Sequence, residues 1–269
     1  MPTLTLGQGL RVTYEDAGQG PAIVLIHGSP GMARNWEPVA RRLADRYRVL
    51  APNLPGYGGS DPRPAGEPRT AHAAAVVEAV IREVGAPVLL AGHSYGGNVA
   101  LAVALRGEVP VVGLVLLDPV LVRVLPAVGR DADYAEVKRV FDAYLERVEG
   151  GDGEAVRVMI DYWFGPGAFD LLPDGARRFL VAHAPVNAVD VRSSFAEPHS
   201  TAALGRLGMP VLVVYGSRSP AVSRAIATAV TAHVPDGTVH ELPGATHALT
   251  TTHADQVADL ITAHAARCL

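Results

Sequence analysis

Cysteine is nearly absent from this sequence, which has a single thiol, Cys268, among its 269 residues. No disulfide can therefore form within the chain, and nothing in the cysteine content calls for an oxidising compartment. Long apolar runs are missing too, because the longest, at residues 109–117, is too short to span a bilayer. The first ten residues carry neither a basic nor an apolar segment. We therefore expect no secretory signal peptide and a cytoplasmic location.

Strong charge of either sign is also lacking. Charged residues make up 19% of the chain, the formal net charge is −4, and no basic cluster is present, which argues against nucleic acid as a partner. The sequence has no His-Glu-x-x-His motif and no dinucleotide fingerprint, so we expect no metal and no cofactor. Apolar residues reach 49%, which is typical of a globular protein. The expected partner is a small-molecule substrate.

Short apolar runs alternate with helical patterns along most of the chain. The runs at residues 22–26, 48–51, 88–91, 111–117 and 211–215 predict buried strands, and residues 4–6 and 10–15 predict edge strands. Residues 239–242 predict the last strand. Helical patterns separate them, including a last helix over residues 255–266. This alternation predicts an α/β protein with a doubly wound, mostly parallel sheet.

The alternation stops between residues 120 and 203, where helices are expected over residues 134–149, 154–163 and 174–184. We therefore expect a core of residues 1–119 and 204–269, interrupted by a helical lid at 120–203. Aromatic residues gather in this insertion, and Phe141, Tyr144 and Trp163 are candidates for the substrate pocket. The alternative is that these rings only form the core of the insertion itself.

The most informative stretch lies at the end of the strand at residues 88–91, where Ser94 stands between Gly92 and Gly96. A strand that turns directly into a helix around one residue strains that residue, and only glycine fits two positions to either side. The geometry would lift the Ser94 hydroxyl to the carboxyl edge of the sheet. The pattern therefore predicts a nucleophilic serine. The alternative is an ordinary glycine-rich turn.

A serine nucleophile needs a base within hydrogen-bond reach and donors for the oxyanion. His247 follows the last predicted strand and precedes the last helix, so its loop can extend over the carboxyl edge towards Ser94. We predict that His247 is the base. Among the other histidines, His93 is expected to be structural, and His27 is expected to support the oxyanion loop at the wall of the substrate pocket.

Together these motifs resemble the α/β-hydrolase superfamily along essentially the whole core. The segments that carry the resemblance are HGSPG at 27–31, LPGYGGS at 54–60, GHSYGG at 92–97 and PGATH at 243–247. The resemblance implies that the backbone N–H groups of Ser29 and Tyr95 hold the oxyanion. It leaves the reaction open, because the superfamily includes esterases, lactonases and C–C bond hydrolases as well as some lyases and cyclases.

One position departs from the family pattern. The family's triad aspartate usually follows the strand at residues 211–215 by a fixed spacing, and here that position is Ser219. A serine cannot balance an imidazolium charge. Asp118, directly after the strand at residues 111–117, is the predicted replacement, and some members of the superfamily are similar in carrying the acid there. Glu241, within the last strand, is the weaker alternative.

These residues predict a serine hydrolase acting through an acyl-enzyme on a small to medium, largely apolar ester, lactone or related acyl compound. Ser94, His247 and Asp118 would form its triad. A second hypothesis keeps the fold but replaces hydrolysis by a cyclase or lyase reaction, since the altered acid position could mark different chemistry. A third is a ligand-binding protein with an inactive site. The oligomeric state stays open.

Overall fold

The computed structural model of the protein describes residues 1–63, 69–197 and 200–269, and one eight-stranded sheet forms its centre. The strand order is β1-β2-β4-β3-β5-β6-β7-β8. β2 pairs antiparallel with both of its neighbours, β1 and β4, and strands β3 to β8 all run parallel to one another. The strands are β1 (Thr3–Thr5), β2 (Arg11–Ala17), β3 (Ala22–Ile26), β4 (Arg48–Pro52), β5 (Val88–His93), β6 (Val111–Leu117), β7 (Val211–Gly216) and β8 (Gly237–Leu242).

The helices, with short 3-10 turns between some of them, follow the strands along the chain. They are α1 (Glu37–Leu43), α2 (Thr70–Val84), α3 (Tyr95–Arg106), α4 (Val124–Ala127), α5 (Asp131–Glu149), α6 (Val156–Phe164), α7 (Asp174–Ala196), α8 (Thr201–Leu204), α9 (Ala221–Thr231), α10 (Leu249–Thr252) and α11 (Ala254–Cys268). None of the helices described is long and apolar enough to cross a membrane.

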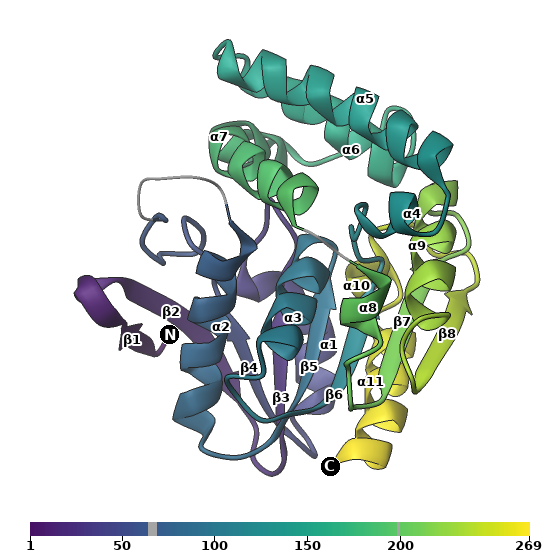
Figure 1. Ribbon diagram of the computed structural model, residues 1–269. Coiled ribbons are helices and arrows are strands. Elements are labelled where there is room, and N and C mark those ends of the chain that lie inside the picture. Colours follow the sequence, from purple (N-terminus) through teal and green to yellow (C-terminus); the bar gives the residue numbers. More distant parts are fainter. Residues whose placement is uncertain (64–68, 198–199) are drawn as a thin grey trace.

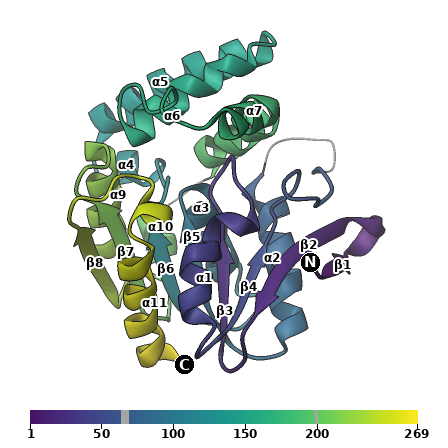
Figure 2. The same ribbon diagram turned by 180° about the vertical axis from the view of Figure 1, so that it is seen from behind.

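Helices cover both faces of the sheet, and the alternation of side chains along each strand supplies a core to each face. Val24 and Ile26 of β3 pack with α2, α3 and α9 on one face. Ile23 and Leu25 pack with α1 and α11 on the other. The two views in Figures 1 and 2 show these two layers on opposite sides of the sheet. The doubly wound, mostly parallel α/β sheet predicted from the sequence is thereby confirmed.

A helical segment leaves the sheet after β6 and returns before β7. Figure 1 shows its helices α5, α6 and α7 above one end of the sheet, the end at which the segment connects to the strands. Because β6 ends where this segment begins, the covered end is the carboxyl edge of the parallel strands. This is the edge at which a ligand site is expected in an open α/β sheet.

Helix α7 is longer than predicted. The sequence pattern ended it at residue 184, before Pro185, yet it continues through Pro185 to Ala196. A proline removes one backbone hydrogen bond and normally ends a helix. Here the second half of α7 is buried at Ala188 and Val191, as well as at Asn187 and Asp190, so tertiary packing offsets that loss.

Candidate active site

Ser94 sits at the junction of β5 and α3 in a conformation that non-glycine residues rarely adopt, with φ 55° and ψ −122°. Its N–H donates to the carbonyl of Leu117 at 3.0 Å, which ties the turn to the next strand. A Cβ on Gly92 would lie 2.2 Å from the carbonyl oxygen of Gly96, and one on Gly96 would lie 2.3 Å from that of Ile26. Only glycine fits these two positions, so the backbone itself presents Ser94 at the edge of the sheet.

Asp118 and His247 come together beside Ser94, although 129 positions separate them in the sequence. Asp118 follows β6 directly, with φ 43°, and its Oδ2 lies 3.8 Å from Nδ1 of His247. The same Oδ2 accepts hydrogen bonds from the Ser219 hydroxyl at 2.7 Å and from the Gly216 N–H at 3.3 Å. Asp118 Oδ1 and His247 Nδ1 are both buried and have no hydrogen-bond partner among the described residues.

The other two acid candidates lie in different relations to the histidine. Ser219, at the position where the family usually has its aspartate, contacts the Asp118 carboxylate instead of carrying one itself. Glu241 is exposed on the edge strand β8, and its Oε2 accepts a hydrogen bond from the Tyr215 hydroxyl at 2.7 Å. Asp118 is therefore the carboxylate that the structure places beside His247.

Aromatic rings surround the imidazole of His247. Trp163 stacks on it with ring centres 4.8 Å apart, and Phe164 meets it edge-on at 5.4 Å. His93 Nε2 lies 2.8 Å from the carbonyl oxygen of His247 and so ties its loop to the residue before Ser94. Burial lowers the pKa of His247 to about 3 and raises the pKa of Asp118, so burial favours the uncharged form of both groups.

The two predicted oxyanion donors flank Ser94. Among the described residues, no acceptor is paired with the backbone N–H of Ser29 or of Tyr95, and both residues line a cavity together with Ser94. His27 supports the loop that carries Ser29. Its Nδ1–H donates to the carbonyl of Gly28 at 2.7 Å, and its Nε2 accepts from the N–H of Leu54 at 3.0 Å.

Two cavities meet at Ser94. The larger, of about 450 Å³, is lined by Ser94, His247, Trp163 and Phe164, with further apolar side chains from α6 and α7. The smaller, of about 30 Å³, is lined by Ser94, Trp163 and Phe141, but His247 is not part of its wall. Trp163 and Phe141 thus lie where the sequence predicted, beside the nucleophile.

Two residues expected in the pocket wall lie elsewhere. Neither cavity is lined by His27, which is buried beneath the Ser29 loop. Tyr144 is fully buried inside the helical segment, where its hydroxyl donates to the side-chain oxygen of Asn187 at 2.6 Å. Both corrections have the same cause. Each side chain has a polar partner inside the protein that draws it away from the cavity.

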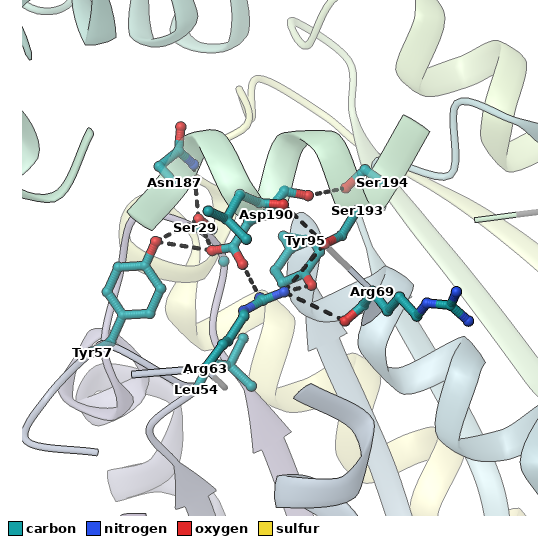
Figure 3. Close-up of polar contacts among 12 residues, drawn as sticks. Ser29, Leu54, Tyr57, Arg63, Arg69, Tyr95, Asn187, Asp190, Ser193 and Ser194 are labelled. Atoms are coloured by element: carbon teal, nitrogen blue, oxygen red, sulfur yellow. Dashed lines mark hydrogen bonds and ion pairs between the residues drawn. The ribbon is translucent and has the colours of Figure 1, made fainter. Parts of the chain in front are cut away.

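A buried polar cluster that no sequence motif predicts includes Ser29, Asn187 and Asp190, which line part of the smaller cavity. Figure 3 shows its contacts. Its centre is an ion pair between Arg63, which precedes α2, and Asp190 on α7. Asp190 Oδ2 also accepts from the Ser29 hydroxyl at 2.5 Å and from the Tyr57 hydroxyl at 2.9 Å. Asn187 donates to the Ser29 hydroxyl at 2.8 Å.

A weak signal for this cluster is present in the sequence. Asn187 and Asp190 share a helix face with Ala184, Ala188 and Val191, at the three- and four-residue spacing of a buried side. Polar residues on such a face need buried partners. The partners themselves cannot be identified from the sequence, because Arg63 and Asp190 are 127 positions apart.

Within the described part of the chain, no group of three or more His, Cys, Asp or Glu side chains is arranged to hold a metal ion. The buried carboxylates Asp118 and Asp190 lie in separate clusters with different partners.

Comparisons with known proteins agree with this fold. A model of the "Alpha/beta hydrolase family" matches residues 23–260. The chain is 35% identical over 153 residues to a 2-hydroxymuconate semialdehyde hydrolase of Pseudomonas sp. strain CF600, a match that covers 52% of this chain and 53% of that one. It is 26% identical to a pimeloyl-[acyl-carrier protein] methyl ester esterase of Chromobacterium violaceum, over 89% of this chain and 92% of that one.

Solved structures share the whole fold. A thermophilic esterase from Thermogutta terrifontis superimposes with a TM-score of 0.73 at 25% identity, covering 97% of this chain and 96% of that one. The match to the first of the curated relatives spans only about half of its length, so that protein's activity does not transfer as a whole.

Proposed function

This chain belongs to the α/β-hydrolase family, and from that premise we propose that it is a serine hydrolase working through an acyl-enzyme on Ser94. The observation that carries the proposal is the convergence on one cavity of a strained, glycine-flanked serine and a buried histidine backed by a carboxylate. The substrate is a small-molecule ester, lactone or related acyl compound. The two esterases among the similar proteins support an ester.

In the first half-reaction, the Ser94 hydroxyl attacks the substrate carbonyl while His247 takes up its proton. The N–H groups of Ser29 and Tyr95 donate hydrogen bonds to the oxyanion that forms. His247 then gives the proton to the leaving group. In the second half-reaction a water molecule, deprotonated by His247, attacks the acyl-enzyme and releases the acid.

Ser94 and His247 face the same cavity without a direct hydrogen bond between them. Such catalytic contacts are often long before a substrate is bound and shorten in the complex. The distance of 3.8 Å between Asp118 and His247 needs to close by about 1 Å to make a hydrogen bond. As His247 becomes charged during attack, its attraction to the Asp118 carboxylate increases and favours that closure.

The two cavities fit the two parts of an ester. His247 must reach the leaving group to protonate it, and it lines only the larger cavity, which therefore takes the leaving group. The smaller cavity of about 30 Å³ takes the acyl group. Helices α5, α6 and α7 supply most of the apolar wall over Ser94, so the segment of residues 120–203 acts as the lid of the site.

The proposal is tested by labelling and kinetics together. An alkyl fluorophosphonate should label Ser94, and the protein should hydrolyse a p-nitrophenyl ester of a short acid. Ser94→Ala should fold normally and abolish both reactions. Thr228→Ala, which removes an exposed hydroxyl from α9, is the matched control and should keep both. A Ser94→Ala protein that still turns over its substrate would favour the non-hydrolytic cyclase or lyase alternative.

A further inference from the structure

The buried ion pair of Arg63 and Asp190 joins the lid to the core at one point. Asp190 lies on α7 of the lid, and Arg63 lies in the connection between β4 and α2 of the core. Both side chains are almost completely buried. The mechanism of acyl transfer uses neither residue. Burying a charged pair costs desolvation free energy, so such a pair is poorly explained by stability alone and points to a further role.

Each partner of the ion pair contacts one of the two residues that we propose as oxyanion donors. Asp190 accepts the hydrogen bond of the Ser29 hydroxyl at 2.5 Å. Arg63 donates to the Tyr95 hydroxyl at 3.1 Å. Figure 3 shows Ser29 and Tyr95 on either side of the pair. One ion pair therefore contacts the side chains of the two residues whose backbone N–H groups flank Ser94.

The Ser29 hydroxyl donates to Asp190 and accepts from the Asn187 amide at 2.8 Å. The Tyr57 hydroxyl, which donates to the same Asp190 oxygen, lies 2.8 Å from the Ser29 hydroxyl. The neighbour of Ser29, Gly28, has no side chain to fix this stretch of backbone, and a Cβ there would lie 3.0 Å from Cβ of Ser94. The loop thus passes close to the nucleophile, and the Ser29 side chain fixes it on the side of α7 while His27 supports it from the core.

Asp190 and Asn187 line part of the smaller cavity, but the polar contacts of the Asp190 carboxylate are made with protein groups. One Asp190 oxygen is occupied by Arg63 and the other by Ser29 and Tyr57. A carboxylate whose oxygens are already paired gains little from a further ligand. Its contacts are directed to protein groups, and Ser29 is the one nearest the reaction.

We propose that Arg63 and Asp190 are positioning residues that aim the N–H groups of Ser29 and Tyr95 at the oxyanion, so that the oxyanion hole is complete only when α7 is docked on the core. The inference rests on the proposed function. It makes the lid a part of the catalytic apparatus as well as the wall of the substrate pocket.

The direction in which the rate changes when the charge of Asp190 is removed distinguishes a positioning role from a direct electrostatic effect. A carboxylate near a developing oxyanion opposes it, so removing the negative charge of Asp190 would by itself speed the reaction. If Asp190 acts by holding Ser29 in place, Asp190→Asn should slow the reaction instead. Removing an oxyanion donor outright costs about 10²–10³ in kcat, and misplacing one should cost less.

The experiment compares Ser29→Ala and Asp190→Asn with the wild-type enzyme, using a short p-nitrophenyl ester and an alkylboronic acid that forms a tetrahedral adduct on Ser94. Ser29→Ala keeps the backbone N–H and loses only its anchor. Both variants should lose about 10-fold or more in kcat, with KM within about twofold, and should bind the boronic acid correspondingly more weakly. The double variant should be no worse than the poorer single one, because both break the same link.

Glu78→Gln is the matched control. Glu78 is another buried carboxylate, paired with Arg106 at 2.6 Å on the α2–α3 side of the core. This variant should lower the melting temperature without changing kcat or the affinity for the boronic acid. If Asp190→Asn does not fold, Tyr95→Phe replaces it, since it removes only the hydroxyl that Arg63 contacts.

Two results would overturn the proposal in distinguishable ways. If the wild-type enzyme hydrolyses esters, and Ser29→Ala and Asp190→Asn retain its kcat and boronic acid affinity, the ion pair is only a structural contact and the serine hydrolase assignment survives. If the wild-type protein neither hydrolyses esters nor binds the boronic acid, the proposed function fails and this inference fails with it.

Discussion

The Ser219 hydroxyl donates a 2.7 Å hydrogen bond to the Asp118 carboxylate, across the gap between the loops that follow β7 and β6. Ser219 occupies the position from which relatives with the usual pattern supply the triad acid. Here it holds an acid supplied by the neighbouring strand. Relative to that pattern, the carboxylate beside His247 lies one strand away, at the end of β6, and Ser219 donates a hydrogen bond to it.

If Asp118 is the working acid, Asp118→Asn should lower kcat by about 10²–10⁴, with little change in KM. The loss is expected because the amide cannot stabilise the charged imidazole formed during attack, as in serine proteases where the same exchange costs about 10⁴. Steady-state kinetics on a p-nitrophenyl ester would measure it. A near wild-type rate would leave a Ser94–His247 dyad or another acid as the alternative.

Ser219→Ala should be mild by comparison, with a loss of a few-fold in kcat, because the Gly216 N–H still contacts the Asp118 carboxylate. Introducing Ser219→Asp into the Asp118→Asn background should restore part of the activity by returning the acid to the family's usual position. Kinetics on the single and double variants would show this. A Ser219→Ala enzyme as slow as Asp118→Asn would contradict the division of roles.

Phe141→Leu should shift the acyl preference towards longer chains, because Phe141 lines the smaller cavity. The ring is also buried in the lid, so the melting temperature should fall as well. Phe169→Leu is the control, since Phe169 is equally buried in the lid but lines neither cavity at Ser94. Rates for esters of two to eight carbons would decide. If both variants lose only stability, Phe141 is simply lid core.

Trp163 should have a broader effect, because it lines both cavities and stacks on His247. Trp163→Phe should change the preference for the leaving group as well as for the acyl group. Matched series of esters, one varying the acid and one the alcohol, would separate the two effects. An unchanged ranking in both series would show that Trp163 contacts no part of the substrate.

The protein should lose stability as the pH falls below about 6.5. Burial lowers the pKa of His27 to about 4 and the pKa values of His93 and His247 to about 3 in the folded state. Between those values and the ordinary histidine pKa of about 6.5, the unfolded chain binds protons that the folded one does not. Stability therefore decreases with decreasing pH, by up to about 1.4 kcal/mol per pH unit for each histidine.

Proton uptake by Asp118 and Asp190 acts in the opposite direction, because burial raises the pKa of both carboxyl groups. These two groups oppose four histidines, since burial lowers the pKa of His264 as well. Urea unfolding at pH 7.5, 6.5 and 5.5, together with proton uptake on unfolding measured at pH 5.5, would test the net effect. A midpoint that stays constant, or rises, from pH 7.5 to 5.5 would contradict it.

Much of the fold could be predicted because it depends on local patterns. Short continuous apolar runs such as residues 22–26 indicate buried strands. The glycines around Ser94 indicate a steric constraint that acts within five residues. Helix α7 shows the limit of this reasoning. Pro185 locally favours the end of a helix, and the contacts that stabilise α7 beyond Pro185 come from distant parts of the chain.

The site divides in the same way. Ser94 and His247 lie in motifs, and Asp118 could be predicted from its place at the end of a strand. Arg63, Tyr57 and Asp190 carry no motif, and their association depends on how the lid docks on the core. Tyr144 shows the converse. As an aromatic residue of the insertion it is a candidate for the pocket wall, but the hydrogen bond of its hydroxyl to Asn187 orients the ring away from the cavities.

The crowding around Gly92 and Gly96 has a consequence for how mutational scans of this protein should be interpreted. Any side chain at Gly96 would meet the backbone of β3, so every substitution there should be as damaging as the loss of Ser94. Loss of activity alone would then make Ser94 and Gly96 look equally important, although only Ser94 is proposed to contact the substrate. Abundance of folded protein, recorded alongside activity, distinguishes them: Ser94 variants should accumulate to normal levels, and Gly96 variants should not.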